Sequence, residues 1–259
     1  MNQEERRRFL IEELLRERLS CRRQEIPADT DRQKVLLRSL MNVRHPGAIS
    51  QRFLEVQDAY LQGELAAKKI TRLSELSPLQ NGIYLWRGDI TTIECDAIVN
   101  AANSGMTGCY CPNHGCIDNA IHTYAGVQLR LKCAEIMERQ GFEEPTGQAK
   151  ITPAYNLPCD YVIHTVGPIV QGKLTRQHCK LLESCYRSCL TLADENQVPS
   201  IAFCCISTGV FMFPNDKAAE IAVRTVQEYK AETGSKIEVI FNVFKEQDER
   251  IYSKLLRAD

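Results

Sequence analysis

The sequence lacks any long apolar run, and no stretch approaches the roughly 20 residues that a helix needs to span a bilayer. It also lacks an excess of charge of either sign, since 32 Lys and Arg face 33 Asp and Glu. A chain with this balance is not drawn as a whole toward nucleic acid or an anionic membrane, so we expect neither as a partner. The first residues, MNQEERRRFLIEELLRERL, lack the apolar segment and cleavage site of a secretory signal. We therefore expect a cytoplasmic protein.

Cysteine, in contrast, is abundant, with 12 residues in a chain of 259. A disulfide framework would require export, for which the sequence carries no signal. Most of the cysteines have apolar or helical neighbours, as Cys185 does, and we interpret these as small buried hydrophobic residues. Cys109, Cys111 and Cys116 differ, because they are crowded with His114 into a stretch that contains Gly, Pro and Asn.

Residues 1–80 have the pattern of polar-faced helices. Breaks fall at Pro27, at His45-Pro46-Gly47 and near Ser77-Pro78. The apolar residues that recur at helical spacing are Phe9, Leu10, Leu14, Leu15, Leu36, Leu37, Leu40 and Met41. We predict a helical N-terminal extension that packs on or beside a main domain of residues 81–259. Nothing in the extension suggests a chemical role.

From Gly82 onward, short apolar strands alternate with long helical patterns. We predict helices at about 118–139, 176–196 and 216–232, and strands at 83–86, 97–100, 150–152, 161–166, 200–206 and 237–243. This alternation predicts an α/β layer fold with a largely parallel sheet covered on both faces. In such sheets ligands bind beyond the carboxyl ends of the strands.

Two short motifs follow the first two predicted strands of this region. Gly88-Asp89-Ile90-Thr91 puts a carboxylate where it can accept a hydrogen bond from an exocyclic amine, such as that of adenine. Asn100-Ala101-Ala102-Asn103 ends the next strand, and its two amides can hold a polyol. Both motifs also have plainer interpretations, since a Gly-Asp pair is common in turns and asparagine caps loops.

The segment Ser207-Thr208-Gly209-Val210-Phe211 lies between a predicted strand and a predicted helix. Such a junction presents successive backbone N–H groups, and glycine permits close approach of a diphosphate. The alternative is an ordinary loop that ends in a helix cap.

The segment from Gly108 to Asp118 is the most informative. Three thiols and an imidazole within eight residues match the soft nitrogen and sulfur ligands that zinc prefers. Because no distant Cys-x-x-Cys partner exists, the segment is not a self-contained zinc finger. Three ligands with one open position would be typical of a catalytic site, and a fourth from Cys111 would close the coordination sphere. Free thiols in a loop remain the alternative.

Asp118 and His122 occupy the first turns of the helix that follows. An aspartate there can cap the helix and interact with its dipole, or it can act in chemistry. His122, one turn further on, is more typical of a packed or hydrogen-bonded histidine.

Taken together, five segments resemble the macrodomain family in order and spacing. They are Gly88–Thr91, Asp96–Ser104, Ile117–His122, Tyr161–Pro168 and Ile206–Phe211. The resemblance is closest to the deacetylase-like branch that hydrolyses ADP-ribosyl groups. Where that branch carries a run of glycines, this chain has Cys109 through Cys116, which is similar to the zinc-containing microbial macrodomains. Those proteins also carry a helical N-terminal extension.

The resemblance implies a three-layer α/β/α macrodomain with a mixed, largely parallel sheet, and zinc-dependent removal of mono-ADP-ribose from modified proteins. It implies one Zn2+ per chain on Cys109, His114 and Cys116, and catalysis by Asp118 and Asn103. The residues implied in binding ADP-ribose are Asp89, Ile90, Asn103, Cys116, Ile117, Asp118, Ser207, Thr208, Gly209, Val210 and Phe211. Members of the group are associated with sirtuin-like transferases and lipoyl-carrier proteins, which implies such a carrier as the modified substrate. The alternative function is a reader module that binds ADP-ribose without cleavage.

Overall fold

The computed structural model describes residues 1–18 and 25–257 of the chain. Its centre is a six-stranded sheet in the order β2-β8-β7-β4-β6-β5. Five strands run parallel to their neighbours, and only β5 at the edge is antiparallel. The strands are β2 Ile83–Arg87, β4 Ala97–Ala102, β5 Ala149–Pro153, β6 Tyr161–Val166, β7 Ser200–Phe203 and β8 Glu238–Val243. The inner strands are almost entirely buried, as expected for a parallel sheet covered on both faces.

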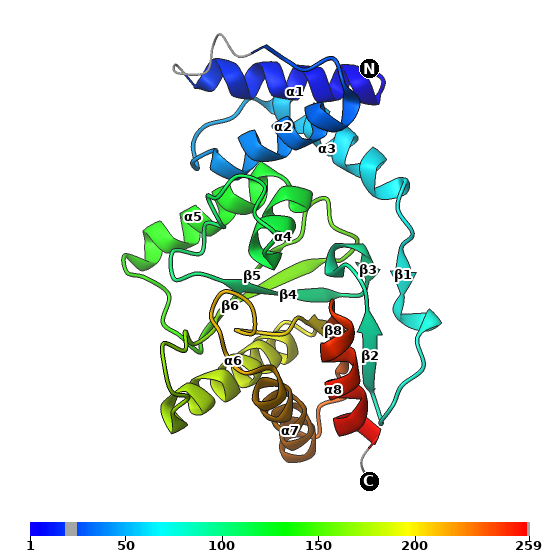
Figure 1. Cartoon of the computed structure of the whole chain (residues 1–259), viewed down its shortest axis with the longest axis vertical. Helices are drawn as coiled ribbons and strands as arrows, with labels where there is room; N and C mark the ends of the chain where they lie inside the picture. Colours follow the sequence, from blue (N-terminus) through cyan, green and yellow to red (C-terminus); the bar gives the residue numbers. More distant parts are fainter. Residues whose placement is uncertain (19–24, 258–259) are drawn as a thin grey trace.

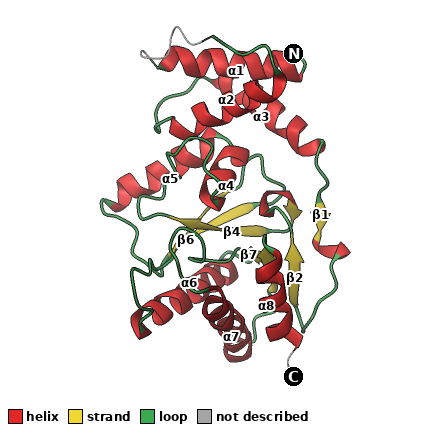
Figure 2. Cartoon of the chain, in the orientation of Figure 1, coloured by secondary structure: helices red, strands yellow, loops and turns green. Residues whose placement is uncertain are grey.

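Helices cover the two faces of this sheet (Figures 1 and 2). On one face lie α4 Ile117–Ala125 and α5 Val127–Gln140. On the other lie α6 Arg176–Glu195, α7 Asn215–Thr233 and α8 Glu246–Arg257. The predicted three-layer α/β/α architecture is therefore confirmed.

Three details differ from the prediction. The single helix expected at 118–139 is two helices, because Gly126 adopts φ +98°, a conformation that ends α4 before α5 begins. The strand expected to reach residue 206 ends at Phe203, and the chain beyond it turns away from the sheet. The C-terminal helix α8 was not predicted. It buries Tyr252 and Leu256 against the domain, and Ile251 and Leu255 pack partly buried beside them. The helical spacing of these four residues is therefore a signal for α8 that the sequence interpretation missed.

The N-terminal extension consists of α1 Gln3–Glu17, α2 Thr30–Val43 and α3 Gln51–Ala66, as the helical pattern predicts. Each helix begins at a side-chain cap, from Asn2, Asp29 and Ser50 respectively. The helices bury their own apolar cluster, which also includes Val127 of α5. In Figure 1 they lie beyond α4 and α5, on the side away from the sheet. A two-residue strand, β1 Thr71–Arg72, pairs with β3 Ile93–Glu94 on the way into the main sheet.

The parallel topology puts the carboxyl ends of β2, β4, β6 and β7 at one edge of the sheet. The polar motifs singled out in the sequence follow these ends, so the fold brings them to a common edge. None of the helices in the described ranges is long and apolar enough to cross a bilayer.

Candidate functional site

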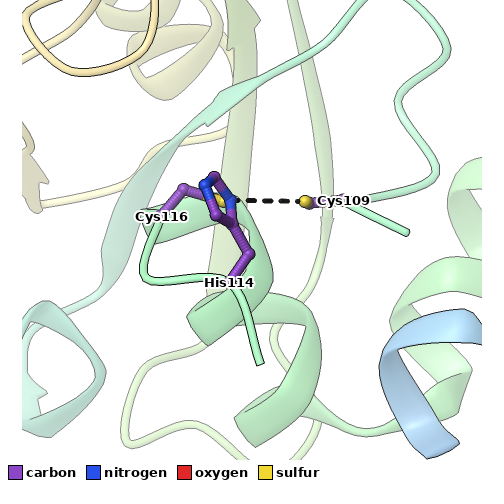
Figure 3. Close-up of side chains that lie close together, drawn as sticks. All are labelled: Cys109, His114 and Cys116. Carbon is purple, nitrogen blue, oxygen red and sulfur yellow. Dashed lines mark hydrogen bonds between the residues drawn. The ribbon is translucent and has the colours of Figure 1, made fainter. Parts of the chain in front are cut away.

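Cys109, His114 and Cys116 converge before α4. Their ligand atoms all lie within 4.8 Å of one another, and Cys109 Sγ is 3.5 Å from His114 Nδ1 (Figure 3). All three side chains are half-buried, whereas Cys111 is exposed and outside this group. Two thiols and an imidazole at this spacing are a donor set that suits zinc.

The start of α4 fixes Cys116 in this group. Cys116 is the N-cap residue, and its Sγ accepts the backbone N–H of Asn119 at 3.4 Å. Burial raises the pKa of the Cys116 thiol to about 11. A metal ion bound here would have to displace that proton, so its binding would release protons and strengthen with pH.

Asp118 is the second residue of α4, two residues after Cys116, and is only 5% exposed. Its Oδ1 accepts from Asn100 Nδ2 at 2.8 Å, and its Oδ2 accepts from Asn103 Nδ2 at 3.3 Å. Burial raises the pKa of this carboxyl to about 6, opposed by the hydrogen bonds from Asn100 and Asn103 and by the charge of Arg130. The carboxylate is thus held in one orientation by amides at the end of β4.

Asn103 connects the carboxylate to the loop that carries Cys109, His114 and Cys116. Its Nδ2 donates both to Asp118 Oδ2 and to the carbonyl of Gly108, while its Oδ1 accepts the N–H of Gly105. Loop, amide and acid therefore form one continuous hydrogen-bonded unit.

Behind this unit lie two buried histidines. His164 of β6 contacts Asn100 Nδ2 through Nδ1 at 3.1 Å and Thr152 Oγ1 through Nε2 at 2.9 Å. His122 lies 3.5 Å from Asp118 Oδ1, and neither of its ring nitrogens has a hydrogen-bond partner among the described residues. His164 was not expected in the site, because a histidine within an apolar strand gives no signal until its neighbours are known.

We expect His164 to make the protein less stable in acid. Burial lowers the pKa of His164 from 6.5 to about 3, so the unfolded chain takes up a proton that the folded chain excludes. Above about pH 6.5 His164 is neutral in both states and does not lower the free energy of unfolding. Below that pH, protonation of the unfolded chain at His164 should lower the free energy of unfolding by about 1.4 kcal/mol per pH unit. Urea unfolding of wild type and His164→Gln between about pH 7 and 4.5 measures this effect. Equal pH slopes for the two proteins would contradict it.

Asp89 follows β2, an outermost strand of the sheet, whereas Asn103 follows the inner strand β4. Asp89 caps the short 3-10 helix Ile90–Thr92, accepting from the backbone N–H and the hydroxyl of Thr91 at 3.0 and 2.7 Å. Lys68, which follows α3, lies 3.7 Å from the other carboxylate oxygen. Ile90 is buried beneath it. The carboxylate remains partly exposed and can accept from a ligand.

The loop after β7 provides backbone donors. Within the described chain, the N–H groups of Gly209, Val210 and Phe211 donate to no protein acceptor, and Val210 is 67% exposed. Ser207 takes φ +66°, and its hydroxyl is buried without a partner. A Cβ at Gly167 would lie 2.1 Å from that hydroxyl and 2.9 Å from a methyl group of Ile206, so a larger residue there would displace both side chains. Thr208 is held by its hydroxyl on the Cys205 carbonyl.

These features define the class of the protein as a three-layer α/β domain whose polar side chains, among them the candidate metal ligands, lie at the carboxyl edge of the sheet. The chain belongs to the Macro domain family, which it matches over residues 99–222. It is similar to the protein-ADP-ribose hydrolase of Treponema medium, with 62% identity across 99% of this chain and 100% of that one. It is also similar to the protein-ADP-ribose hydrolase of Staphylococcus aureus (strain MSSA476), with 49% identity across 97% and 95% of the two chains.

Solved structures of macrodomains resemble the fold. The Trypanosoma brucei macrodomain in complex with ADP-ribose superposes with a TM-score of 0.66 and 31% identity, over 84% of this chain and 94% of that one. The Oceanobacillus iheyensis macrodomain with ADP gives a TM-score of 0.63 and 35% identity, over 70% and 94%. The family and fold predicted from the sequence motifs are confirmed.

Proposed function

We propose that this protein is a zinc-dependent hydrolase that removes mono-ADP-ribose from modified proteins. The observation that carries the proposal is the unit formed by the metal-binding loop, Asn103 and Asp118. It joins a three-ligand group to a buried acid at the ligand-binding edge of the sheet. The names of the relatives from Treponema medium and Staphylococcus aureus support the reaction.

ADP-ribose would lie along the strand ends. Asp89 would accept from the adenine amine, and Ile90 would contact the ring through its backbone. The N–H groups of Cys116 and Ile117, at the start of α4, donate to no acceptor among the residues described, and they would face the diphosphate from one side. The loop Ser207–Phe211 would face it from the other with its unpaired N–H groups. The distal ribose would then lie beside Asn103 and Asp118.

Cys109, His114 and Cys116 fit a single zinc ion, because they offer three soft ligands from one loop and leave the fourth position open. Bound zinc would supply positive charge for polarising a ribose hydroxyl or a water molecule. Cleavage at C1″ of the distal ribose passes through an oxocarbenium-like state, as in glycoside hydrolysis. Asp118 would orient or deprotonate the attacking water, and Asn103 would hold the ribose so that C1″ faces it.

A reader module that binds ADP-ribose without cleaving it is the alternative, because a fold does not fix a function. The metal-ligating group argues against that alternative, since binding alone gives no evident use for a metal at the distal ribose. A zinc site that only orders the loop would need a fourth ligand, and Cys111 lies outside the group.

The substrate we expect is a mono-ADP-ribosylated protein. Its identity as a lipoyl carrier modified by a sirtuin-like transferase stays a prediction from the resemblance, as does a cytoplasmic location.

Single-turnover release of ADP-ribose tests the proposal. Zinc-loaded and chelator-stripped protein are compared on proteins mono-ADP-ribosylated through aspartate, glutamate or serine. Zinc-dependent release, with ADP-ribose affinity largely kept after stripping, would support the hydrolase. Tight binding without release from any linkage would leave the reader module.

A further inference from the structure

We propose that helix α2 of the N-terminal extension is part of the metal site, with Arg38 and Asn42 as positioning residues that set the affinity for zinc. They hold residues 111–114 in the conformation that aims His114 at Cys109. The inference rests on the zinc site proposed above and does not depend on hydrolysis.

Arg38 reaches from α2 to both sides of the ligand group. Its Nη2 donates to the carbonyl of His114 at 3.2 Å. Its Nη2 and Nε also donate to Asn119 Oδ1, at 2.9 and 3.3 Å. No ion pair joins Arg38 to a carboxylate within the described ranges. The guanidinium is therefore used for directional hydrogen bonds to the backbone of a ligand and to the first turn of α4.

Asn119 extends this connection along the loop. Its Nδ2 donates to the carbonyl of Cys111 at 3.0 Å, and its backbone N–H donates to the sulfur of Cys116. Asn119 is completely buried, so it holds a fixed orientation. Arg38 thus acts on His114 directly and, through Asn119, on the residues that flank it.

Asn42, one turn after Arg38 on the same face of α2, fixes the turn before His114. Its Oδ1 accepts the N–H of Asn113 at 2.9 Å, and its Nδ2 donates to Thr123 Oγ1 at 2.9 Å. Asn113 has φ +54°, in the left-handed region that asparagine tolerates better than most residues. The bond from Asn42 fixes the backbone N–H of this turn directly next to His114.

The end of α2 anchors the start of the loop as well. Arg130 of α5 donates through Nη1 to the carbonyls of Met41 and Asn42 at 3.0 and 2.9 Å, and through Nε to the carbonyl of Thr107 at 2.6 Å. Its guanidinium also lies 4.5 Å from the ring of Tyr110. The loop is therefore attached to the extension on both sides of Cys109.

These contacts should raise the affinity for zinc, because they fix the loop before the metal binds. A free loop that contains glycine and proline loses conformational entropy when three of its side chains must converge on one ion. Contacts that already fix the backbone remove part of that cost. Loss of residues that orient metal ligands typically lowers metal affinity by about 10- to 100-fold.

Zinc affinity of the full chain, measured by competition with a chelating dye, tests the inference. We expect Arg38→Ala to raise the Kd for zinc by about 10- to 100-fold. Arg38→Lys keeps the charge but offers one donor group in place of a fork, so it should recover part of the affinity. Arg32→Ala, an exposed arginine on the same helix, is the matched control and should bind zinc as wild type does.

Cobalt substitution gives a second readout, because the visible absorption of bound Co2+ reports ligand geometry. We expect an altered band in Arg38→Ala and Asn42→Ala, and an unchanged band in Arg32→Ala. If Arg38→Ala does not fold, the zinc affinity and cobalt spectrum of Arg38→Lys provide the test instead. Wild-type zinc affinity and cobalt spectra in the folded Arg38 variants, even with a lowered melting temperature, would overturn the inference alone. A wild-type protein that binds no zinc would overturn both the inference and the proposed metal site.

Discussion

Replacing Asp118 with asparagine should lower the single-turnover rate of ADP-ribose release by about 10²- to 10⁴-fold, the usual contribution of a positioned acid or base. Asparagine keeps the volume and the acceptor toward Asn100 but cannot take a proton from water or hold a negative charge near C1″. Because the proposed diphosphate contacts are backbone N–H groups that this substitution leaves in place, the Kd for ADP-ribose should change by only a few-fold.

Asp216→Asn is the matched control for this variant. Asp216 also lies in the first turn of a helix and near the strand-end loops, but its side chain is exposed. It should retain the wild-type rate. A rate for Asp118→Asn within about threefold of wild type would remove Asp118 from the mechanism, since that is far below the effect of a general base.

Removing a metal ligand should have an effect of similar size. We expect Cys109→Ser and His114→Ala to lose zinc affinity by more than the roughly 100-fold upper range of outer-shell changes. Release of ADP-ribose should fall with zinc occupancy, because the charge beside the distal ribose is lost. Zinc content after dialysis, dye competition and single-turnover release measure these effects.

Cys111→Ser is a closely matched control, because it removes a thiol only two residues from Cys109. Cys111 is exposed and lies outside the ligand group, so zinc affinity and turnover should stay at wild-type values. A large loss in Cys111→Ser would instead make Cys111 the fourth ligand and favour a zinc ion that only orders the loop.

The predictions separate two properties that the site combines. Asp118 and Asn103 should affect turnover more than zinc affinity, whereas Arg38 and Asn42 should affect zinc affinity first. The physical reason is that the two pairs contact different parts of the site. The first pair faces the expected position of the ribose, and the second contacts the loop from the side of the extension.

The α/β class, most of the strands and the cluster of candidate metal ligands can be predicted from the linear chain. Parallel strands such as β4 and β6 are buried on both faces, so each is a largely apolar run, interrupted only by Asn100 in β4 and by His164 and Thr165 in β6. The loop from Gly108 to Cys116 was recognisable because three thiols and a histidine crowd within a few residues. Local patterns of this kind are present in the linear chain.

The residues of the site that lie outside those patterns are visible only in the folded protein. His164 joins it because β6 pairs with β4, which brings its ring against Asn100. Arg38 and Asn42 join it because α2 packs against α4, although each is more than 70 residues in sequence from its contact in the loop, His114 and Asn113 respectively. The extension suggested no chemistry as a sequence, because a lone arginine or asparagine on an amphipathic helix looks the same whether it faces solvent or a partner. Contacts between distant segments are set by packing, and a local sequence pattern does not encode them.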